Sequence, residues 1–281
     1  MAHAKINGIN LRYEVQGQGE PIMFFPGLGV GVGYFRFVEP LFSRQFTTVL
    51  VDPRGIGGSL PEDKNEELTA EKWADDFAAL ARHLGFSRVH LVGSSHGGCM
   101  AMAMVERHRE LIASCSLLGA FSELSAAMEI NFRLRVNIVS KLGMGEEIAD
   151  HITLWTASPR FLDSPAGFEA ARNTVNLVRS VDPQRYLALL RSIQQWGRVL
   201  PGQESEPKFT ARLSAFRTPV LALTGDSDHF IPARMSRMIA DAVPRALYRE
   251  IPQCGHISVN EKPQETFAIV SDFIKQQRIG A

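Results

Sequence analysis

The sequence predicts an α/β fold in which helices cover both faces of a mostly parallel central sheet and a helical cap is inserted into the chain. Three observations predict it. Short apolar runs alternate with stretches of helical periodicity up to residue 121. Strand signals then disappear from 122 to 216, where apolar residues recur at helical spacing. Both patterns return afterwards, so the chain divides into a first core segment (1–121), a cap (122–216) and a second core segment (217–281).

The first core segment begins with an alternating pattern over residues 9–15, which predicts an antiparallel strand. Continuous apolar runs predict strands buried on both faces, as in a parallel sheet, at residues 21–25, 46–51, 89–92 and 113–118. Apolar residues at helical spacing predict helices over residues 34–42, 70–84 and 96–107. This alternation of strand and helix favours a parallel sheet with helices on both faces.

The cap is predicted to be a set of separate helices that lie over one end of the sheet. Proline interrupts its helical pattern at positions 159, 165, 183 and 201. After the cap, apolar runs predict strands at residues 220–224 and 247–251, and helical periodicity predicts helices over residues 233–242 and 263–276.

The composition indicates a large apolar core and no surplus of charge. Of 281 residues, 45% are hydrophobic, and 30 Lys and Arg balance 30 Asp and Glu. A formal net charge of zero gives no support to binding of nucleic acid or of an anionic membrane. We therefore expect a small-molecule partner, no nucleic acid and no membrane, and either a monomer or a homodimer.

The sequence shows neither a targeting segment nor a membrane span. The first residues lack the apolar run of a signal peptide, and no stretch approaches the roughly 18 apolar residues of a spanning helix. The three cysteines have no metal-ligand spacing and lie in apolar or structured stretches, so we expect them to be buried. These features predict a cytoplasmic protein that needs no metal and no organic cofactor.

The stretch from Leu91 to Gly98 carries the strongest chemical signal, because an apolar strand there enters a sharp turn and then a helix. It contains Gly93-x-Ser95-x-Gly97, the pattern of a nucleophile elbow. The tight turn lifts the serine hydroxyl clear of the backbone, and the glycines remove side chains that would clash. Small residues also cluster in ordinary turns, so a catalytic assignment requires a base and an acid as well.

A base and an acid are predicted at the ends of two later strands. The first strand leads into Asp226 and Asp228, and the second leads into His256. Because the carboxyl ends of parallel strands meet at one edge of the sheet, these residues converge there with Ser95. We assign His256 as the base and Asp228 as the acid, since Asp228 lies further past its strand with room to point back at the histidine. Asp226 is expected to brace the turn.

Several neighbouring polar residues have structural interpretations. His229 adjoins the acid and is expected to be a loop residue, while His96 follows the nucleophile and is expected to contribute its backbone N–H. Asp52 and Arg54 bracket a turn at a strand end, where such pairs usually fix the turn by hydrogen bonds. The glycine-rich loop at 26–33 lacks a phosphate-binding motif, so we interpret it as an oxyanion loop.

Together these motifs resemble the α/β-hydrolase superfamily along nearly the whole chain. They are Pro26-Gly27-Leu28-Gly29, Asp52-x-Arg54-Gly55-x-Gly57-x-Ser59, Gly93-x-Ser95-x-Gly97-Gly98, Gly225-x-x-Asp228-x-x-x-Pro232 and Gly255-His256. The resemblance implies an oxyanion hole formed by the backbone N–H groups of Leu28 and His96. The motif forms are most similar to those of 3-oxoadipate enol-lactonases and related small esterases. Two residues depart from the family pattern, since Pro26 replaces a histidine and His96 replaces an apolar residue.

The resemblance implies a serine hydrolase that cleaves a carboxylic ester or lactone of a small, fairly apolar substrate. Ser95 would attack the acyl carbon, and water activated by His256 would then release the acid. Aromatic residues at helical spacing are more often cap core than pocket, but six are candidates to line the substrate pocket: Tyr34, Phe35, Phe132, Trp155, Phe161 and Trp196.

Four alternatives stay open at this point. A carbon–carbon bond hydrolase would use the same triad on a vinylogous diketone. A cofactor-free dioxygenase shares the Ser-His-Gly-Gly elbow and would tolerate loss of Ser95, but its acid usually follows the strand after the elbow, where residues 119–121 offer no carboxylate. A perhydrolase or haloperoxidase-like activity would depend on peroxide. A ligand-binding receptor on this fold would bind tightly with little turnover.

Overall fold

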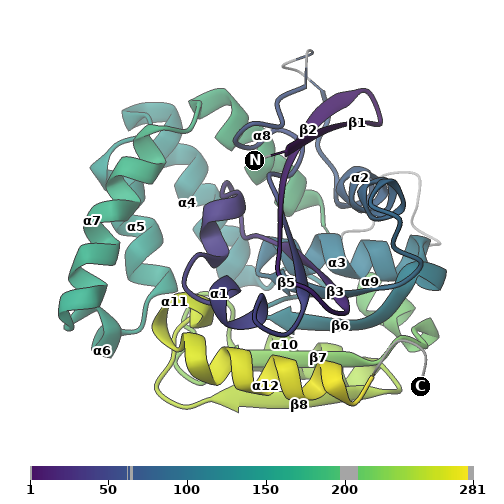
Figure 1. The fold of residues 1–281 in the computed structure, drawn as a ribbon. Coiled ribbons are helices and arrows are strands. Elements are labelled where there is room, and N and C mark those ends of the chain that lie inside the picture. Colours follow the sequence, from purple (N-terminus) through teal and green to yellow (C-terminus); the bar gives the residue numbers. More distant parts are fainter. Residues whose placement is uncertain (1, 62, 64–65, 197–207, 278–281) are drawn as a thin grey trace.

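A computed structural model describes residues 2–61, 63, 66–196 and 208–277. Its centre is an eight-stranded sheet in the order β1-β2-β4-β3-β5-β6-β7-β8 (Figure 1). At one edge, β1 (Ala2–Ile6) pairs antiparallel with β2 (Ile9–Gln16), and β2 pairs antiparallel with β4 (Thr47–Val51). The other strands run parallel to β4: β3 (Pro21–Phe25), β5 (Val89–Ser94), β6 (Ile112–Leu118), β7 (Val220–Gly225) and β8 (Ala246–Ile251). The predicted fold class is confirmed, and β1 is a strand that the sequence pattern did not predict.

Side chains of the central strands alternate between two apolar cores, one on each face of the sheet. In β3, Ile22 and Phe24 pack into one core, while Met23 and Phe25 pack into the other. The first core is covered by α1 (Glu39–Phe42), α11 (Ser258–Glu261) and α12 (Pro263–Lys275), and the second by α2 (Ala70–His83), α3 (His96–Arg107) and α10 (Ala233–Ala242). Burial on both faces requires apolar residues at successive positions, which explains the continuous apolar runs.

The helix predicted over residues 34–42 is two shorter elements in the structure, a 3-10 turn η1 (Val32–Phe35) and α1. Pro40 explains the break, because it lacks an N–H and its ring clashes with the preceding turn of a continuous helix. Proline is accommodated in the first turn of a helix, so the helix restarts at Glu39 with Pro40 as its next residue.

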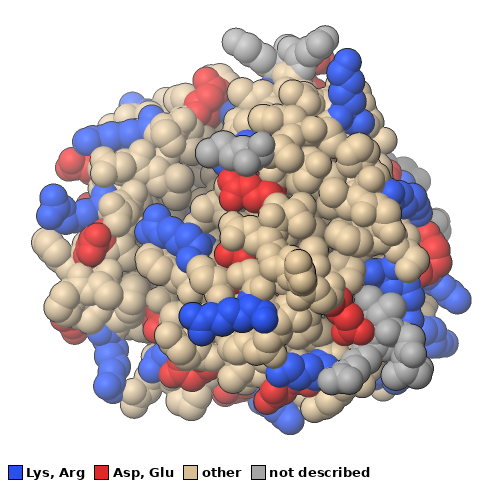
Figure 2. Space-filling view, in the orientation of Figure 1, with Lys and Arg blue, Asp and Glu red and all other residues tan. Residues whose placement is uncertain are grey.

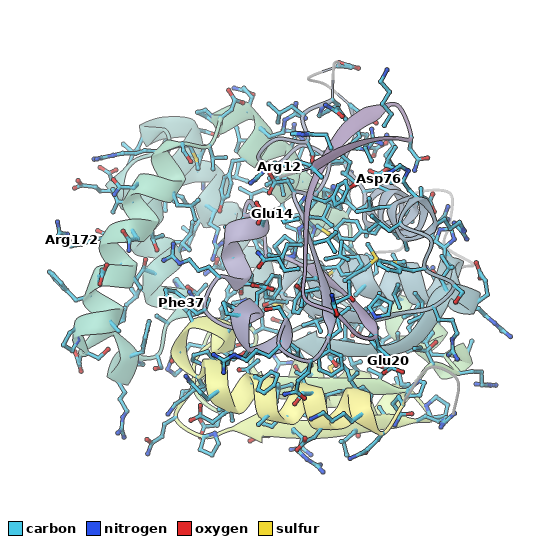
Figure 3. The ribbon with its side chains drawn as sticks, viewed as in Figure 1. Arg12, Glu14, Glu20, Phe37, Asp76 and Arg172 are labelled. Atoms are coloured by element: carbon cyan, nitrogen blue, oxygen red, sulfur yellow. The ribbon has the colours of Figure 1, made fainter. Side chains whose placement is uncertain are left out.

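Asp52 and Arg54 fix the turn after β4, as predicted, but each does so through its own partners. The Asp52 carboxylate is buried and accepts hydrogen bonds from Arg12 Nη1 and from two backbone N–H groups, all at 2.8 Å. Arg54 donates from Nε and Nη2 to the two carboxylate oxygens of Asp76 on α2, both at 2.8 Å. Arg12 on β2 and Asp76 on α2 are labelled in Figure 3.

Between β6 and β7 the described residues form helices and no strand. We call five of them the cap helices: α4 (Ala126–Leu142), α5 (Glu146–Thr156), α6 (Pro159–Leu162), α7 (Pro165–Arg179) and α8 (Pro183–Gln195). In Figure 1, α4 to α7 form a group at the left of the sheet. Proline starts α6, α7 and α8, each after a side chain that caps the helix. Pro201 lies outside the described residues. The short helix α9 (Phe209–Arg212) then leads back to the sheet.

The surface carries a mixture of charges. On the face seen in Figure 2, acidic and basic side chains are interspersed and neither sign gathers into a patch. Within the described part of the chain, no helix is long and apolar enough to cross a membrane. All three cysteines are free and buried, as predicted.

Candidate active site

Ser95 occupies the turn between β5 and α3 with a φ of 54°. A positive φ is uncommon for any residue except glycine and marks a strained backbone. The turn is possible because its glycines approach other backbone atoms closely. A Cβ atom on Gly97 would lie 2.0 Å from the carbonyl oxygen of Phe25, and one on Gly93 would lie 2.6 Å from that of Gly97. The chain therefore adopts the sharp strand-to-helix turn that the glycine spacing predicts.

His256, in the loop after β8, is paired with Asp228, in the loop after β7. Nδ1 of His256 lies 2.8 Å from Oδ2 of Asp228, and both residues are buried. Oδ1 of Asp228 accepts the backbone N–H groups of Phe230 at 3.0 Å and Ile231 at 2.7 Å. The backbone thus holds one carboxylate oxygen while the other orients the imidazole, which leaves Nε2 of His256 available for proton transfer.

The end of β6 brings the serine and the His–Asp pair together. The Ser95 N–H donates to the carbonyl oxygen of Leu118 at 2.9 Å. At the next residue, Gly119, a Cβ atom would lie 3.0 Å from Nδ1 of His256 and 3.3 Å from Oδ2 of Asp228. Adjacent residues at one strand end therefore lie next to all three members of the predicted triad. Among the described residues, no hydrogen bond joins the Ser95 hydroxyl to His256.

The loop that carries His256 is attached to the cap. The backbone N–H of His256 donates to the carbonyl oxygen of Thr156, the last residue of α5, at 2.8 Å. Glu261 accepts from the backbone N–H groups of Gly255 and Ser158, both at 3.0 Å, and from the Ser158 hydroxyl at 2.6 Å. No local sequence signal pointed to Glu261, since its partners lie on two segments far apart in the chain.

The two predicted oxyanion donors have free N–H groups. Among the described residues, no hydrogen bond uses the backbone N–H of Leu28 or of His96. The loop that carries Leu28 is held by Asp52, whose Oδ1 accepts the Val32 N–H at 2.8 Å. Next to Leu28, a Cβ atom on Gly27 would lie 3.8 Å from Cβ of Ser95. The buried Asp52 therefore anchors the loop that lies against the nucleophile.

The other polar residues near the triad have structural roles or lie in the loop. Asp226 accepts a hydrogen bond from the Ser227 hydroxyl at 2.8 Å and from the Cys254 N–H at 3.4 Å, so it braces the turn as predicted. His229 is an exposed loop residue, also as predicted. The ring of His96 is 1% exposed and packs edge-on against Trp73, with ring centres 5.0 Å apart.

Burial lowers the pKa of His96 to about 3, from 6.5, so its ring is neutral in the folded protein. The unfolded chain binds the proton at its ordinary pKa, so stability is full above pH 6.5 and is lost as the pH falls toward 3. We expect the free energy of unfolding to fall by about 2 kcal/mol more in the wild type than in His96→Met between about pH 6.5 and 5.

Urea unfolding at the two pH values measures this difference. The comparison with His96→Met removes the contributions of other buried histidines, because both proteins share them. His83→Gln, at an exposed position, is the control and should behave as the wild type. An equal decrease in the free energy of unfolding in the wild type and in His96→Met would show that protonation of the His96 ring does not destabilise the folded protein.

Of the six aromatic residues proposed for the pocket, Tyr34 lies beside the nucleophile. Its hydroxyl is 2.9 Å from Oγ of Ser94, the residue before Ser95. A Cβ atom on Gly27 would touch the Tyr34 ring and the Ser95 side chain at the same distance, 3.8 Å. Burial raises the pKa of Tyr34 to about 12, so its hydroxyl keeps its proton. Phe132 packs against Phe230 with ring centres 5.6 Å apart, and the Phe230 ring packs in turn against the ring of His256.

Among the described residues, no side-chain hydrogen bond or ring contact joins the other four aromatic residues to the triad. Phe35 packs in the core against Phe24, with ring centres 4.9 Å apart. Trp196 is also core, because its indole N–H donates to the carbonyl oxygen of Phe121 at 3.1 Å. Trp155 is 37% exposed on α5, and Phe161 is half-buried on α6. Phe35 and Trp196 are thus packed in the apolar core, and their assignment to the substrate pocket stays a prediction.

A recess lies at the opposite edge of the sheet, at the amino ends of the parallel strands. It has a volume of about 540 Å³ and is lined in part by Arg88, Ile112, Pro219 and Arg245, at the starts of β5 to β8. The predicted triad lies at the carboxyl ends of the strands, so this recess is remote from it. We therefore assign the chemistry to the triad edge and not to this recess.

Comparison with known proteins agrees with the fold. Residues 20–263 match the model of the alpha/beta hydrolase fold family. Proline iminopeptidase of Lactobacillus helveticus is 26% identical over 267 residues, which cover 91% of this chain and 89% of that protein.

Two solved structures share the fold. A thermophilic esterase from Thermogutta terrifontis has a TM-score of 0.86 at 23% identity, covering 99% of this chain and 100% of that one. The enol-lactonase from Burkholderia xenovorans LB400 has a TM-score of 0.84 at 21% identity, covering 97% and 99%. The family model spans most of the chain, and the protein is therefore a hydrolase that belongs to the α/β-hydrolase fold family.

Proposed function

We propose that this protein hydrolyses a carboxylic ester or lactone through an acyl-enzyme on Ser95. The observation that carries the proposal is the buried Asp228–His256 pair, with its 2.8 Å hydrogen bond, beside a serine held at positive φ. A serine hydroxyl is a poor nucleophile unless a base removes its proton, and an imidazole oriented by a carboxylate is such a base.

The proposed reaction has two halves. Oγ of Ser95 attacks the acyl carbon while Nε2 of His256 takes its proton, and the oxyanion is bound by the N–H groups of Leu28 and His96. The carbon–oxygen bond of the leaving group then breaks, and His256 protonates the departing alkoxide. Water attacks the acyl-enzyme by the same route, with His256 as the base, and releases the carboxylic acid and the free serine.

The resemblance of motif forms and the fold shared with an esterase and an enol-lactonase support an ester or lactone as the substrate. The cofactor-free dioxygenase alternative is less well supported, because its acid is expected after β6, where Gly119, Ala120 and Phe121 stand. The acid that bonds His256 comes instead from the loop after β7. We further propose a cytoplasmic enzyme that acts on a small molecule as a monomer or homodimer.

Stopped-flow kinetics with p-nitrophenyl butyrate test the acyl-enzyme. The wild type should release a burst of nitrophenolate equal to the enzyme concentration, followed by slower turnover, because an activated aryl ester acylates the serine faster than water removes the acyl group. Ser95→Ala should show no burst and should lose at least about 10³-fold in turnover. Comparable rates in both proteins would exclude Ser95 as the nucleophile and redirect attention to base chemistry at His256 or to ligand binding.

A further inference from the structure

Two polar side chains of the cap helix α4 are buried without a full set of partners. Asn131 and Arg135 lie one helical turn apart, and each is 3% exposed. Nε of Arg135 donates to Oδ1 of Asn131 at 2.9 Å, which joins the two side chains. Nδ2 of Asn131 and Nη2 of Arg135, however, have no hydrogen-bond partner. Buried N–H donors are almost always satisfied in folded proteins, so this pair requires an explanation.

Arg135 also lacks a carboxylate partner. A guanidinium keeps its charge at any ordinary pH, and a buried charge is normally paired. Among the ion pairs of the described residues, none includes Arg135. Arg54 is buried to a similar extent, but its guanidinium donates hydrogen bonds to the carboxylates of Asp76 and Glu66.

The guanidinium lies close to the catalytic base. Its central carbon is 4.6 Å from the ring centre of Phe230, and the Phe230 ring is perpendicular to that of His256 with centres 5.2 Å apart. One aromatic ring thus separates Arg135 from the proposed triad. On the cap side, burial first and the Arg135 charge second lower the pKa of His151 to about 4, and Nε2 of His151 also has no partner.

We propose that Asn131 and Arg135 form a subsite for a carboxylate group of the substrate, remote from the bond that is cleaved. The subsite rests on the proposed function, because it presupposes that the substrate is bound beside His256. The natural substrate class is then a monoanion, an ester or lactone whose acyl part ends in a free carboxylate.

The chemistry of the pair favours a carboxylate over other anions. A guanidinium presents parallel N–H groups that match the two coplanar oxygens of a carboxylate, and the amide N–H of Asn131 adds a further donor. One positive charge neutralises one negative charge, whereas a phosphate monoester would bring more. The aromatic rings of Phe132 and Phe230 line the guanidinium and suit a short hydrocarbon chain between the carboxylate and the ester.

Matched esters test the subsite. Mono-p-nitrophenyl adipate carries a free carboxylate, and p-nitrophenyl hexanoate has a neutral chain of the same length. After subtraction of the enzyme-free rate, the wild type should have a kcat/KM at least about 10-fold higher for the adipate ester. Arg135→Met should remove this preference by lowering kcat/KM for the adipate ester. Its kcat/KM for the hexanoate ester should change by less than about 3-fold. Arg133→Met, at an exposed position of the same helix, should leave the preference unchanged.

The outcomes separate the subsite from the proposed function. A wild type without preference for the anionic ester, or equal losses on both esters in Arg135→Met, would overturn the subsite and leave Arg135 as a packing residue. Turnover of both esters by Ser95→Ala at the wild-type rate would instead overturn the acyl-enzyme.

Calorimetry with monomethyl adipate gives a readout independent of turnover. Ser95→Ala should bind it at least about 10-fold more tightly than Ser95→Ala/Arg135→Met binds it. Ser95→Ala/Arg135→Lys keeps the charge but loses the parallel N–H groups of the guanidinium, so its affinity should lie between those of the other two proteins. It replaces Ser95→Ala/Arg135→Met if that variant does not fold. Equal affinities in the three proteins would overturn the subsite.

Discussion

The Asp228→Asn variant is expected to fold normally and to lose about 10⁴-fold in kcat toward an aryl ester. The reason lies in the two roles of the carboxylate. Oδ1 accepts two backbone N–H groups, so the amide oxygen of asparagine will occupy that position and its NH₂ group will face His256. An NH₂ group can only donate, so Nδ1 of His256 becomes an acceptor and Nε2 carries the proton. An imidazole protonated at Nε2 cannot accept the proton of Ser95.

Asp226→Asn is the matched control, because Asp226 lies on the same loop and only braces the turn. Its kcat should stay within a few-fold of the wild type. Steady-state kinetics with p-nitrophenyl butyrate, together with thermal melts of both variants, make the comparison. A loss of less than about 10-fold in a folded Asp228→Asn protein would show that Asp228 does not orient the base.

The Gly97→Ala variant is expected to lose about 3 kcal/mol or more of stability and to lose ester turnover. A Cβ atom at this position would lie 2.0 Å from the carbonyl oxygen of Phe25 and 2.6 Å from that of Pro26. Both atoms belong to the backbone at the end of β3, so the first turn of α3 must move away from the sheet. That movement displaces Ser95 and the N–H of His96, which the proposed mechanism needs in fixed positions.

Gly33→Ala is the control for the loss of a glycine. A Cβ atom there meets no atom within 4 Å, and Gly33 does not have a positive φ. Its stability should change by less than about 0.5 kcal/mol. Urea unfolding of the two variants gives the comparison. A Gly97→Ala protein as stable and active as Gly33→Ala would show that the elbow tolerates a side chain.

The elbow and the His–Asp pair were predictable from the sequence because each follows from a local rule. The turn at Ser95 requires glycines at fixed spacing, which can be read directly. The positions of Asp228 and His256 follow from the ends of two apolar runs, since parallel strands place their carboxyl ends at one edge. The family match confirms the fold class on which this reasoning depended.

Other features required the folded chain. The strand β1 has the sequence Ala-His-Ala-Lys-Ile, which is too short and polar to predict alone, and it forms because β2 offers a free edge. Helical spacing predicted the cap helices but not which neighbour each side chain would meet. The indole N–H of Trp196, for example, bonds the core segment at Phe121, a contact that helical spacing does not predict.

The sequence by itself determined the class of fold, the nucleophile elbow and the residues that approach it at the sheet edge. These depend on periodicity and backbone sterics, which act over a few residues. Only the tertiary structure decided that Glu261 ties the His256 loop to the cap and that Arg135 is buried without a counter-ion. Such contacts join segments that are distant in the chain, and the free energy of a charge depends on its surroundings after folding and not on its neighbours in sequence.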